Sequence, residues 1–405
     1  MTDLDPNSRT FKDSIAAVCD LLAQIDSQNL SPLPTHEVTD VTSATRSALE
    51  MPTDFPPLAS AIVTGDHIAI ALDTNLPAID RVISALLTQL QANGAGEIDI
   101  VVSTETSSSD LAVLRSLVGE LATVHLHQTE KRASFRYLGP DVHDEPVYLN
   151  RWLVDADLVL PVVTKRASDV SANGPHDLTG IYPTFTDANA RRRHHQSRVK
   201  NDTWGDSDAA EQDPEAMSGT AEEPAWLLGV QLILSVTPNQ HGRVAKIECG
   251  SIESARQAAI ETSTADLCDF VTAVVEGGPS QQTWLNIARA AEAATRYTQS
   301  GGTIVVWSDI TEEIASHGDT EFVADEPTAD EQDSEDFTPW DEKAVPFDRI
   351  GSLSEDYQII IRSQLSADSI ERIGLGSIQT PDELKRLAMA FPKRGLLLAA
   401  QYHAH

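Results

Sequence analysis

Short apolar runs alternate with stretches of helical periodicity along most of the chain. The run from Ile68 to Leu72 is typical of a parallel strand that is buried on both faces. Between Ile79 and Leu90, apolar residues then recur at the three- and four-residue spacing of an amphipathic helix. The polar residues 73–75 stand between this strand and this helix. In open α/β sheets, ligands bind at the ends of parallel strands, so we expect a site in this turn.

The same alternation of strand and helix continues in both halves of the chain. In the amino-terminal half, the pattern predicts elements at residues 10–27, 98–102, 110–121, 122–126, 148–154 and 157–163. In the carboxyl-terminal half, it predicts elements at residues 252–261, 269–275, 281–297 and 303–307, followed by a final helix, turn and strand. Repeated strand and helix of this kind favours parallel sheets.

The fold class that we expect is therefore α/β, with mainly parallel sheets flanked by helices. A length of 405 residues is enough for two domains, which we place at residues 1–262 and 263–405. A small ligand would bind in the cleft between them. Two acidic segments, at about residues 201–224 and 319–342, interrupt the pattern and are predicted to be solvated loops, because uncompensated charge disfavours ordering.

Composition excludes several classes of function. A formal net charge of −33 argues against binding to nucleic acid, since the phosphate backbone is held by Lys and Arg. No apolar run approaches the roughly 20 residues that a membrane span needs, and no secretory signal is visible, so we expect a cytoplasmic protein without membrane association. The three cysteines are too few and too scattered for a disulfide framework or a cysteine metal site.

Several segments resemble, in the same order, those of the nickel-dependent lactate racemase family. Residues 47–77, SALEMPTDFPPLASAIVTGDHIAIALDTNLP, resemble its ALENP, PPL and GDKVAIV segments and the D-x-T-R-P loop that follows them. Residues 145–160, 224–260 and 277–307 resemble later segments of the same family. The resemblance covers nearly the whole chain from residue 40.

This resemblance implies a specific chemistry. Members of the family interconvert D- and L-2-hydroxy acids by hydride transfer, using a nickel pincer nucleotide that is tethered through a lysine. One histidine holds the nickel, two further histidines act as acid and base, and an arginine and a lysine position the substrate carboxylate. These roles suit the residue types, because imidazole ionises near neutral pH and a cation attracts a carboxylate.

At several positions that the resemblance assigns, this chain has another residue type. The second strand ends in STETSSS, a turn that contains Thr104 and places Ser107 at the first catalytic histidine. The glycine-rich segment further along places Thr179 at the tether lysine and Asp169 at the second catalytic histidine. His176 lies nearby and could act as that histidine only if the alignment slips. Serine cannot replace an imidazole base.

Other positions keep suitable chemistry. By the resemblance, His195 stands at the spacing of the nickel ligand, and Arg289 falls on the substrate-binding lysine and keeps its positive charge. Asp73 and Asn75 lie in the loop after the first strand, and Lys165 follows the strand that ends at residue 163, where a cation could bind an anion. Each also has a structural explanation, because an aspartate often caps the next helix and a histidine in a basic segment is usually solvated.

Two hypotheses for the function follow. The first is a divergent lactate racemase-like protein, an isomerase that acts on a hydroxy acid or a larger relative but lacks standard lactate racemase activity. The second is a non-catalytic scaffold that binds a nucleotide or a small carboxylate. The resemblance implies the nickel pincer nucleotide as cofactor, but the tether lysine is replaced by Thr179, so the chain could also bind no cofactor.

Overall fold

The computed structural model describes residues 18, 20–22, 24–140, 145–167, 177–203, 224–257, 266–313 and 341–403, without the side chains of residues 196–203. His176 and Asp169, two positions that the resemblance singles out, lie outside the described residues. Almost all of the two acidic segments, predicted as solvated loops, also lies outside them.

The described part of the amino-terminal half contains a six-stranded sheet in the order β4-β3-β2-β7-β8-β9. Its strands are β2 (Ile68–Leu72), β3 (Ile98–Val102), β4 (Thr123–Leu126), β7 (Leu158–Thr164), β8 (Ile233–Pro238) and β9 (Val244–Gly250). All neighbouring pairs are parallel except β8 and β9. In β2 the isoleucines and Leu72 face one core, whereas Ala69 and Ala71 face another, so the strand is buried on both sides as predicted.

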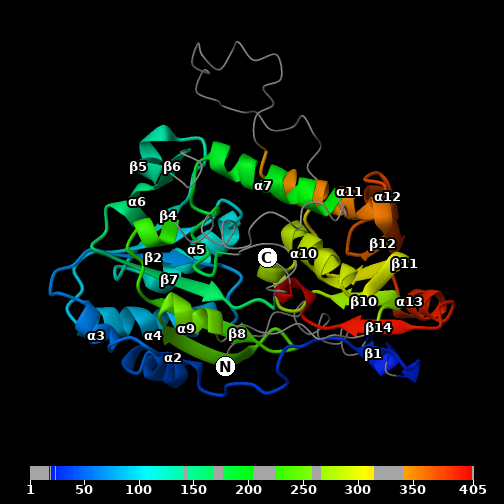
Figure 1. The fold of residues 1–405 in the computed structure, drawn as a ribbon. Helices are drawn as coiled ribbons and strands as arrows, with labels where there is room; N and C mark the ends of the chain where they lie inside the picture. Colours follow the sequence, from blue (N-terminus) through cyan, green and yellow to red (C-terminus); the bar gives the residue numbers. More distant parts are fainter. Residues whose placement is uncertain are drawn as a thin grey trace, which may run out of the picture.

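Helices cover both faces of this first sheet (Figure 1). They are α2 (Val41–Glu50), α3 (Leu58–Ala61), α4 (Ile79–Ala92), α5 (Ser108–Val118), α6 (Arg151–Val154) and α9 (Ile252–Gln257). Helix α7 (Ala188–Thr203) instead runs toward α11 (Val345–Asp356) of the other half and packs against it. An antiparallel hairpin of β5 (Phe135–Pro140) and β6 (Pro146–Asn150) lies beside the helices of the first sheet. The element predicted at 148–154 is thus the end of β6 followed by a helical turn, because the Asn150 side chain accepts a hydrogen bond from the Trp152 N–H at 3.1 Å.

The second sheet has six parallel strands in the order β1-β14-β10-β11-β12-β13 within the described residues. Its strands are β1 (Gln28–Asn29), β10 (Cys268–Val274), β11 (Thr298–Trp307), β12 (Gln358–Arg362), β13 (Gly376–Ile378) and β14 (Arg394–Leu397). The helices are α10 (Trp284–Thr295), α11 (Val345–Asp356), α12 (Ala367–Glu371) and α13 (Pro381–Ala388). From β10 the chain proceeds outward to β13 and then returns through α13 to β14, on the other side of β10.

The residues that precede α2 pack on the second sheet. Strand β1 pairs with β14, and Figure 1 shows the two side by side in blue and red. Val18 and Leu22 are fully buried in one cluster with Phe270 of β10. This segment falls within the expected first domain, at residues 1–262, but its apolar side chains cover the core of the carboxyl-terminal half.

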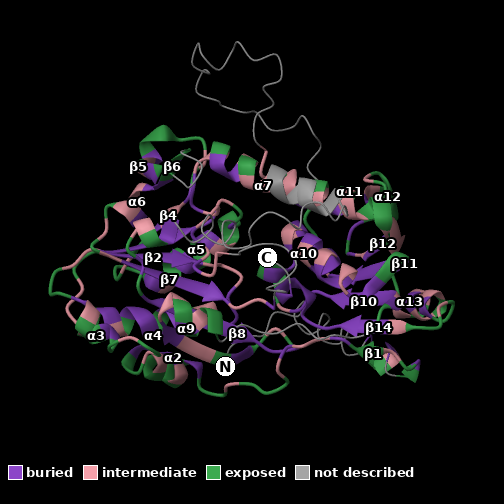
Figure 2. Ribbon diagram, viewed as in Figure 1, coloured by how far each residue is buried: buried purple, intermediate pink, exposed green. Residues whose placement is uncertain are grey.

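Strands form the buried centre of both halves, and helices and turns carry most of the exposed residues (Figure 2). This arrangement confirms the expected α/β class with mainly parallel sheets flanked by helices. In the described part of the chain, no helix is both long enough and apolar enough to cross a lipid bilayer.

The two halves meet beside the loop after β2. The Asn286 side chain of α10 donates a hydrogen bond to Oδ1 of Asn75 at 2.9 Å, and the Tyr402 hydroxyl donates to the Asn75 carbonyl at 3.2 Å. The Arg296 guanidinium donates to the carbonyl of Ala167 at 3.2 Å. These contacts hold α10 next to the turn in which the sequence predicts a site.

Candidate ligand-binding pocket

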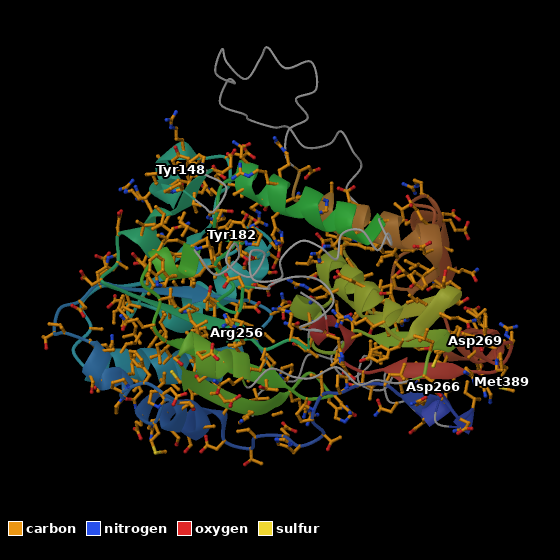
Figure 3. The ribbon with its side chains drawn as sticks, viewed as in Figure 1. Tyr148, Tyr182, Arg256, Asp266, Asp269 and Met389 are labelled. Atoms are coloured by element: carbon orange, nitrogen blue, oxygen red, sulfur yellow. The ribbon has the colours of Figure 1, made fainter. Side chains whose placement is uncertain are left out.

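A cavity of about 210 Å³ lies where the carboxyl ends of β2, β3 and β7 face α7, α10 and α11. Both halves of the chain line it, and Tyr182, labelled in Figure 3, belongs to its wall. The charged and imidazole side chains of its lining are Asp73, Glu105, Arg166, Asp177, Arg191, His194, His195, Arg289 and Arg349. The cavity is therefore rich in guanidinium groups although the chain as a whole is strongly acidic.

Asp73 fixes the loop after β2 and binds Arg166. Its Oδ2 accepts hydrogen bonds from Arg166 Nη2 at 3.0 Å and from the Thr164 N–H at 3.3 Å, while Oδ1 accepts from the Asn75 N–H at 2.9 Å. Burial alone would raise the pKa of Asp73, but Arg166, Arg289 and these hydrogen bonds hold that pKa below its ordinary value. Asp73 is thus an ionised partner of Arg166 rather than a helix cap.

Arg289 brings a partly buried guanidinium into the pocket from α10. Its Nη1 donates to Oδ1 of Asn286 at 3.2 Å, and its Nε is buried without a hydrogen-bond partner among the described residues. Burial, and then repulsion from Arg166, lower the pKa of Arg289 to about 9. Arg289 therefore stays charged at neutral pH, and none of the ion pairs between described residues includes it.

Thr179 and Asp177 form a closed turn in the wall of the pocket. The Asp177 carboxylate accepts hydrogen bonds from the Thr179 N–H at 2.8 Å, the Thr179 hydroxyl at 2.5 Å, and the N–H groups of Ile181 and Tyr182 at 2.7 Å. Burial raises the pKa of Asp177 to about 6, and the hydrogen bonds only partly oppose this. Thr179 is 1% exposed, and its hydroxyl stabilises the turn through the hydrogen bond to Asp177.

The far wall of the pocket joins the two halves through Arg191 of α7. Its Nε is 2.6 Å from Oε1 of Glu342, its Nη2 is 3.6 Å from Oε1 of Glu105, and its Nη1 donates to the Thr184 carbonyl at 2.6 Å. The Thr104 hydroxyl donates to the other carboxylate oxygen of Glu342. A carboxylate from the second half thus lies between two elements of the first half.

Two histidines of α7 lie on the same wall. His195 Nε2 is 3.5 Å from Oδ2 of Asp348 on α11. The His194 ring packs edge-on against Tyr182, with ring centroids 5.7 Å apart. Neighbouring imidazoles in a polar cavity can exchange protons with a bound acid near neutral pH.

The structure brings several of the predicted site residues together. Asp73, Asn75, Thr179, His195 and Arg289 all line the one cavity. They come from both halves of the chain, as the expected interdomain site requires. Their individual functional roles stay predictions.

Other predicted residues are placed elsewhere. The Ser107 side chain caps α5 by accepting a hydrogen bond from the Asp110 N–H at 3.0 Å. Lys165 Nζ is 3.0 Å from Oε2 of Glu248 on β9, whereas the next residue, Arg166, faces the cavity. Thr104 is not part of the cavity lining, and its hydroxyl donates to Glu342, the partner of Arg191.

Sequence reasoning missed several residues of this pocket. Arg191 belongs to the segment ARRRHHQSR, which lacks helical periodicity and resembles a solvated basic stretch. Arg349 lines the cavity from a helix of the other half, and Glu342, which pairs with the lining residue Arg191, lies at the end of an acidic segment. The sequence offers one signal for Asn286, namely an asparagine on the apolar face of an alanine-rich helix, and the structure shows that this side chain is 1% exposed and hydrogen-bonded.

Among the described residues, no cluster of side chains could coordinate a metal ion. No group of three or more His, Cys, Asp or Glu side chains in this part of the chain is arranged to hold a metal ion. His195, the predicted nickel ligand, lies near one carboxylate, that of Asp348.

Known proteins share part of the sequence of this chain and nearly all of its fold. The family model of the lactate racemase N-terminal domain matches residues 18–164. The lactate racemase apoprotein from Thermoanaerobacterium thermosaccharolyticum has a TM-score of 0.67 and 14% identity, over 93% of this chain and 93% of that chain. A structural-genomics protein from Thermotoga maritima has a TM-score of 0.63 and 12% identity, over 91% of this chain and 99% of that one.

No curated protein matches the sequence. At identities this low, the two solved structures establish a shared fold, while the family model identifies the amino-terminal part of the chain. Residues 18–164 of this chain therefore match the lactate racemase N-terminal domain, and nearly the whole chain shares the fold of the lactate racemase apoprotein.

Proposed function

We propose that this protein binds a small carboxylate in the cavity between its two sheets, with Arg289 as the main cationic contact, and that it does not racemise lactate. The observation that carries the proposal is the buried Nε of Arg289, which has no hydrogen-bond partner among the described residues. A carboxylate satisfies such a guanidinium through two parallel hydrogen bonds. Asp73 is already bonded to Arg166, so it leaves the charge of Arg289 available to a ligand.

The size of the cavity favours a small acid over a nucleotide. Its volume of about 210 Å³ lies below the roughly 300–1,000 Å³ of pockets that bury drug-sized ligands. The abundance of guanidinium groups in its lining suits an anionic ligand. Of the two ligands in the scaffold hypothesis, the carboxylate is the better fit.

The residues of the pocket do not fit a covalently tethered nickel nucleotide. Thr179, at the tether position by the resemblance, has no amine, and its hydroxyl donates to Asp177. No lysine belongs to the cavity lining among the described residues, and Lys165 pairs with Glu248 instead. The residues present therefore do not support hydride transfer through a tethered cofactor of this kind.

The acid–base positions support the same proposal. By the resemblance, Ser107 replaces one catalytic histidine, and its hydroxyl caps a helix. Losing one positioned acid–base group typically lowers a rate by about 10² to 10⁴. Lactate racemisation by the standard mechanism would then fall far below that of a complete family member.

A second candidate function is a racemase- or epimerase-like reaction on a hydroxy acid. It is favoured by one observation, namely that His194 and His195 line the same cavity as Arg289. An imidazole beside a bound carboxylate could accept the proton of a neighbouring hydroxyl group.

Calorimetric titration with lactate tests the proposal. Wild-type protein should bind lactate, and Arg289→Gln should weaken binding about tenfold or more, because a charge-assisted hydrogen bond is lost. The control is Arg372→Gln, which removes the same charge from an exposed position of the same half. Absence of lactate binding, or equal binding in Arg289→Gln, contradicts the carboxylate site. Enantiomer composition should stay constant throughout, and clear turnover would favour the second candidate.

A further inference from the structure

We propose that Glu342 is a specificity-determining residue, whose carboxylate fills a second anion subsite at Arg191 so that the pocket accepts monocarboxylates and rejects dicarboxylates. This inference rests on the proposed carboxylate site at Arg289 and extends it. It assigns a function to an acidic residue of one half that contacts the ligand-binding wall of the other.

Glu342 occupies the position that the carboxylate of a ligand would take at Arg191. One oxygen lies 2.6 Å from Arg191 Nε, and the other accepts a hydrogen bond from the Thr104 hydroxyl. The side chains of Arg191 and Glu342 are 9% and 15% exposed, so water screens this ion pair weakly. A guanidinium and a hydroxyl that bind both oxygens of one carboxylate would serve a ligand carboxylate equally well.

This subsite adjoins the proposed ligand site. Arg191, Glu105 and Arg289 all line the same cavity. Glu105 lies 3.6 Å from Arg191 Nη2, and its negative charge also acts on Arg289. Glu105 therefore pairs with Arg191 in the same cavity that Arg289 lines, and its charge reaches both guanidinium groups.

Arg289 and Arg191 differ in whether a carboxylate of the protein already pairs with them, and this difference determines which ligands fit. Arg289 lacks a carboxylate partner among the described residues, whereas Arg191 faces both Glu342 and Glu105. A monocarboxylate can bind Arg289 and leave these pairs intact. The second carboxylate of a longer acid would meet two like charges near Arg191, and it could bind there only by displacing Glu342.

The test compares lactate with succinate in Glu342→Gln, which keeps the size of the side chain and removes its charge. Wild-type protein should bind lactate more tightly than succinate. The variant should bind succinate about tenfold or more tightly than wild type does, with lactate affinity changed by less than about twofold. The matched control is Glu355→Gln, which removes a charge from an exposed position of α11 and should change neither affinity.

A second variant covers the case in which Glu342→Gln does not fold, as judged by thermal unfolding. Thr104→Val removes one of the two contacts of the Glu342 carboxylate and keeps its ion pair with Arg191, so it should raise succinate affinity by about threefold. Unchanged succinate affinity, while lactate still binds through Arg289, overturns the role of Glu342 and leaves the carboxylate site standing. Failure of wild type and variants to bind either acid overturns the proposed function and this inference together.

Discussion

The side-chain amide of Asn286 donates a hydrogen bond to Oδ1 of Asn75 at 2.9 Å across the junction of the two halves. Oδ1 of the same Asn286 side chain accepts a hydrogen bond from Arg289 Nη1 at 3.2 Å. One buried amide thus links the loop after β2 to the proposed ligand contact. The geometry of the pocket therefore depends on how the two sheets are docked.

Replacing this amide should affect both stability and binding. Asn286→Ala removes hydrogen bonds to Asn75 and Arg289 and leaves polar groups buried, so we expect a loss of about 1–3 kcal/mol of unfolding free energy. Lactate affinity should fall as well, because Arg289 loses its support. Denaturant unfolding and calorimetry measure the two effects, with the exposed Gln299→Ala as control. A variant as stable as wild type would show that the amide does not couple the halves.

The ion pair of Asp73 and Arg166 should contribute to stability rather than to ligand binding. Their side chains are 17% and 10% exposed, so Asp73→Asn leaves a mostly buried guanidinium without its carboxylate, at a cost of about 3 kcal/mol. Lactate affinity should not fall, since the pocket becomes more positive. Chemical denaturation provides the measurement.

The matched control for Asp73→Asn is Asp155→Asn, which breaks the pair of Asp155 with Arg136. These side chains are 46% and 47% exposed, so the loss should stay below about 1 kcal/mol. Equal losses in the two variants would mean that burial of the Asp73 pair has no energetic consequence.

Sequence patterns predicted the framework of this site better than its chemistry. The apolar run of β2 and the polar turn after it determined where the pocket lies, because burial on both faces requires a parallel strand whose end meets a helix. Arg289 was found through the resemblance, and it lines the cavity. Arg191 and Glu342 were not found, because an ion pair between residues 151 positions apart leaves no local pattern.

The same limit applies to the amino-terminal segment. Its apolar periodicity predicts a helix, but periodicity does not indicate which of two sheets the helix covers. Val18 and Leu22 pack against Phe270, more than two hundred residues away, which a local pattern cannot reveal.

Acidification should destabilise the protein through His127. Burial lowers the pKa of His127 to about 4, against 6.5 for an ordinary histidine. Its Nε2 lies 2.9 Å from the Thr186 carbonyl and its Nδ1 lies 3.0 Å from the Asn150 amide nitrogen, which fits a neutral ring. Between pH 6.5 and 4 the unfolded chain binds a proton that the folded chain does not, so stability falls as the pH falls.

Because burial lowers the pKa of His127 from 6.5 to about 4, the full effect on the unfolding free energy is about 3 kcal/mol. Urea unfolding at pH 7 and pH 4.5 should show a smaller difference in His127→Gln than in wild type. Comparison with this variant separates His127 from other titrating groups, including Asp177, whose raised pKa acts in the opposite direction. The same pH dependence in both proteins would contradict the assignment.

Intact-mass measurement tests the absence of a tethered cofactor. Protein produced in a host that makes the pincer nucleotide should have the mass of the bare chain, because Thr179 offers no amine and is bonded to Asp177. Thr179→Lys, produced in the same host, shows whether restoring the amine is enough for attachment. An added nucleotide mass on a lysine-containing peptide of the unmodified chain would show that another residue serves as the tether.

A crystal structure of the protein with lactate at saturating concentration tests the proposed carboxylate site most directly. We predict that the lactate carboxylate lies in the cavity within hydrogen-bond distance of Arg289 Nε, while Glu342 stays on Arg191. Lactate bound away from Arg289, or a cavity without lactate at that concentration, would contradict the account.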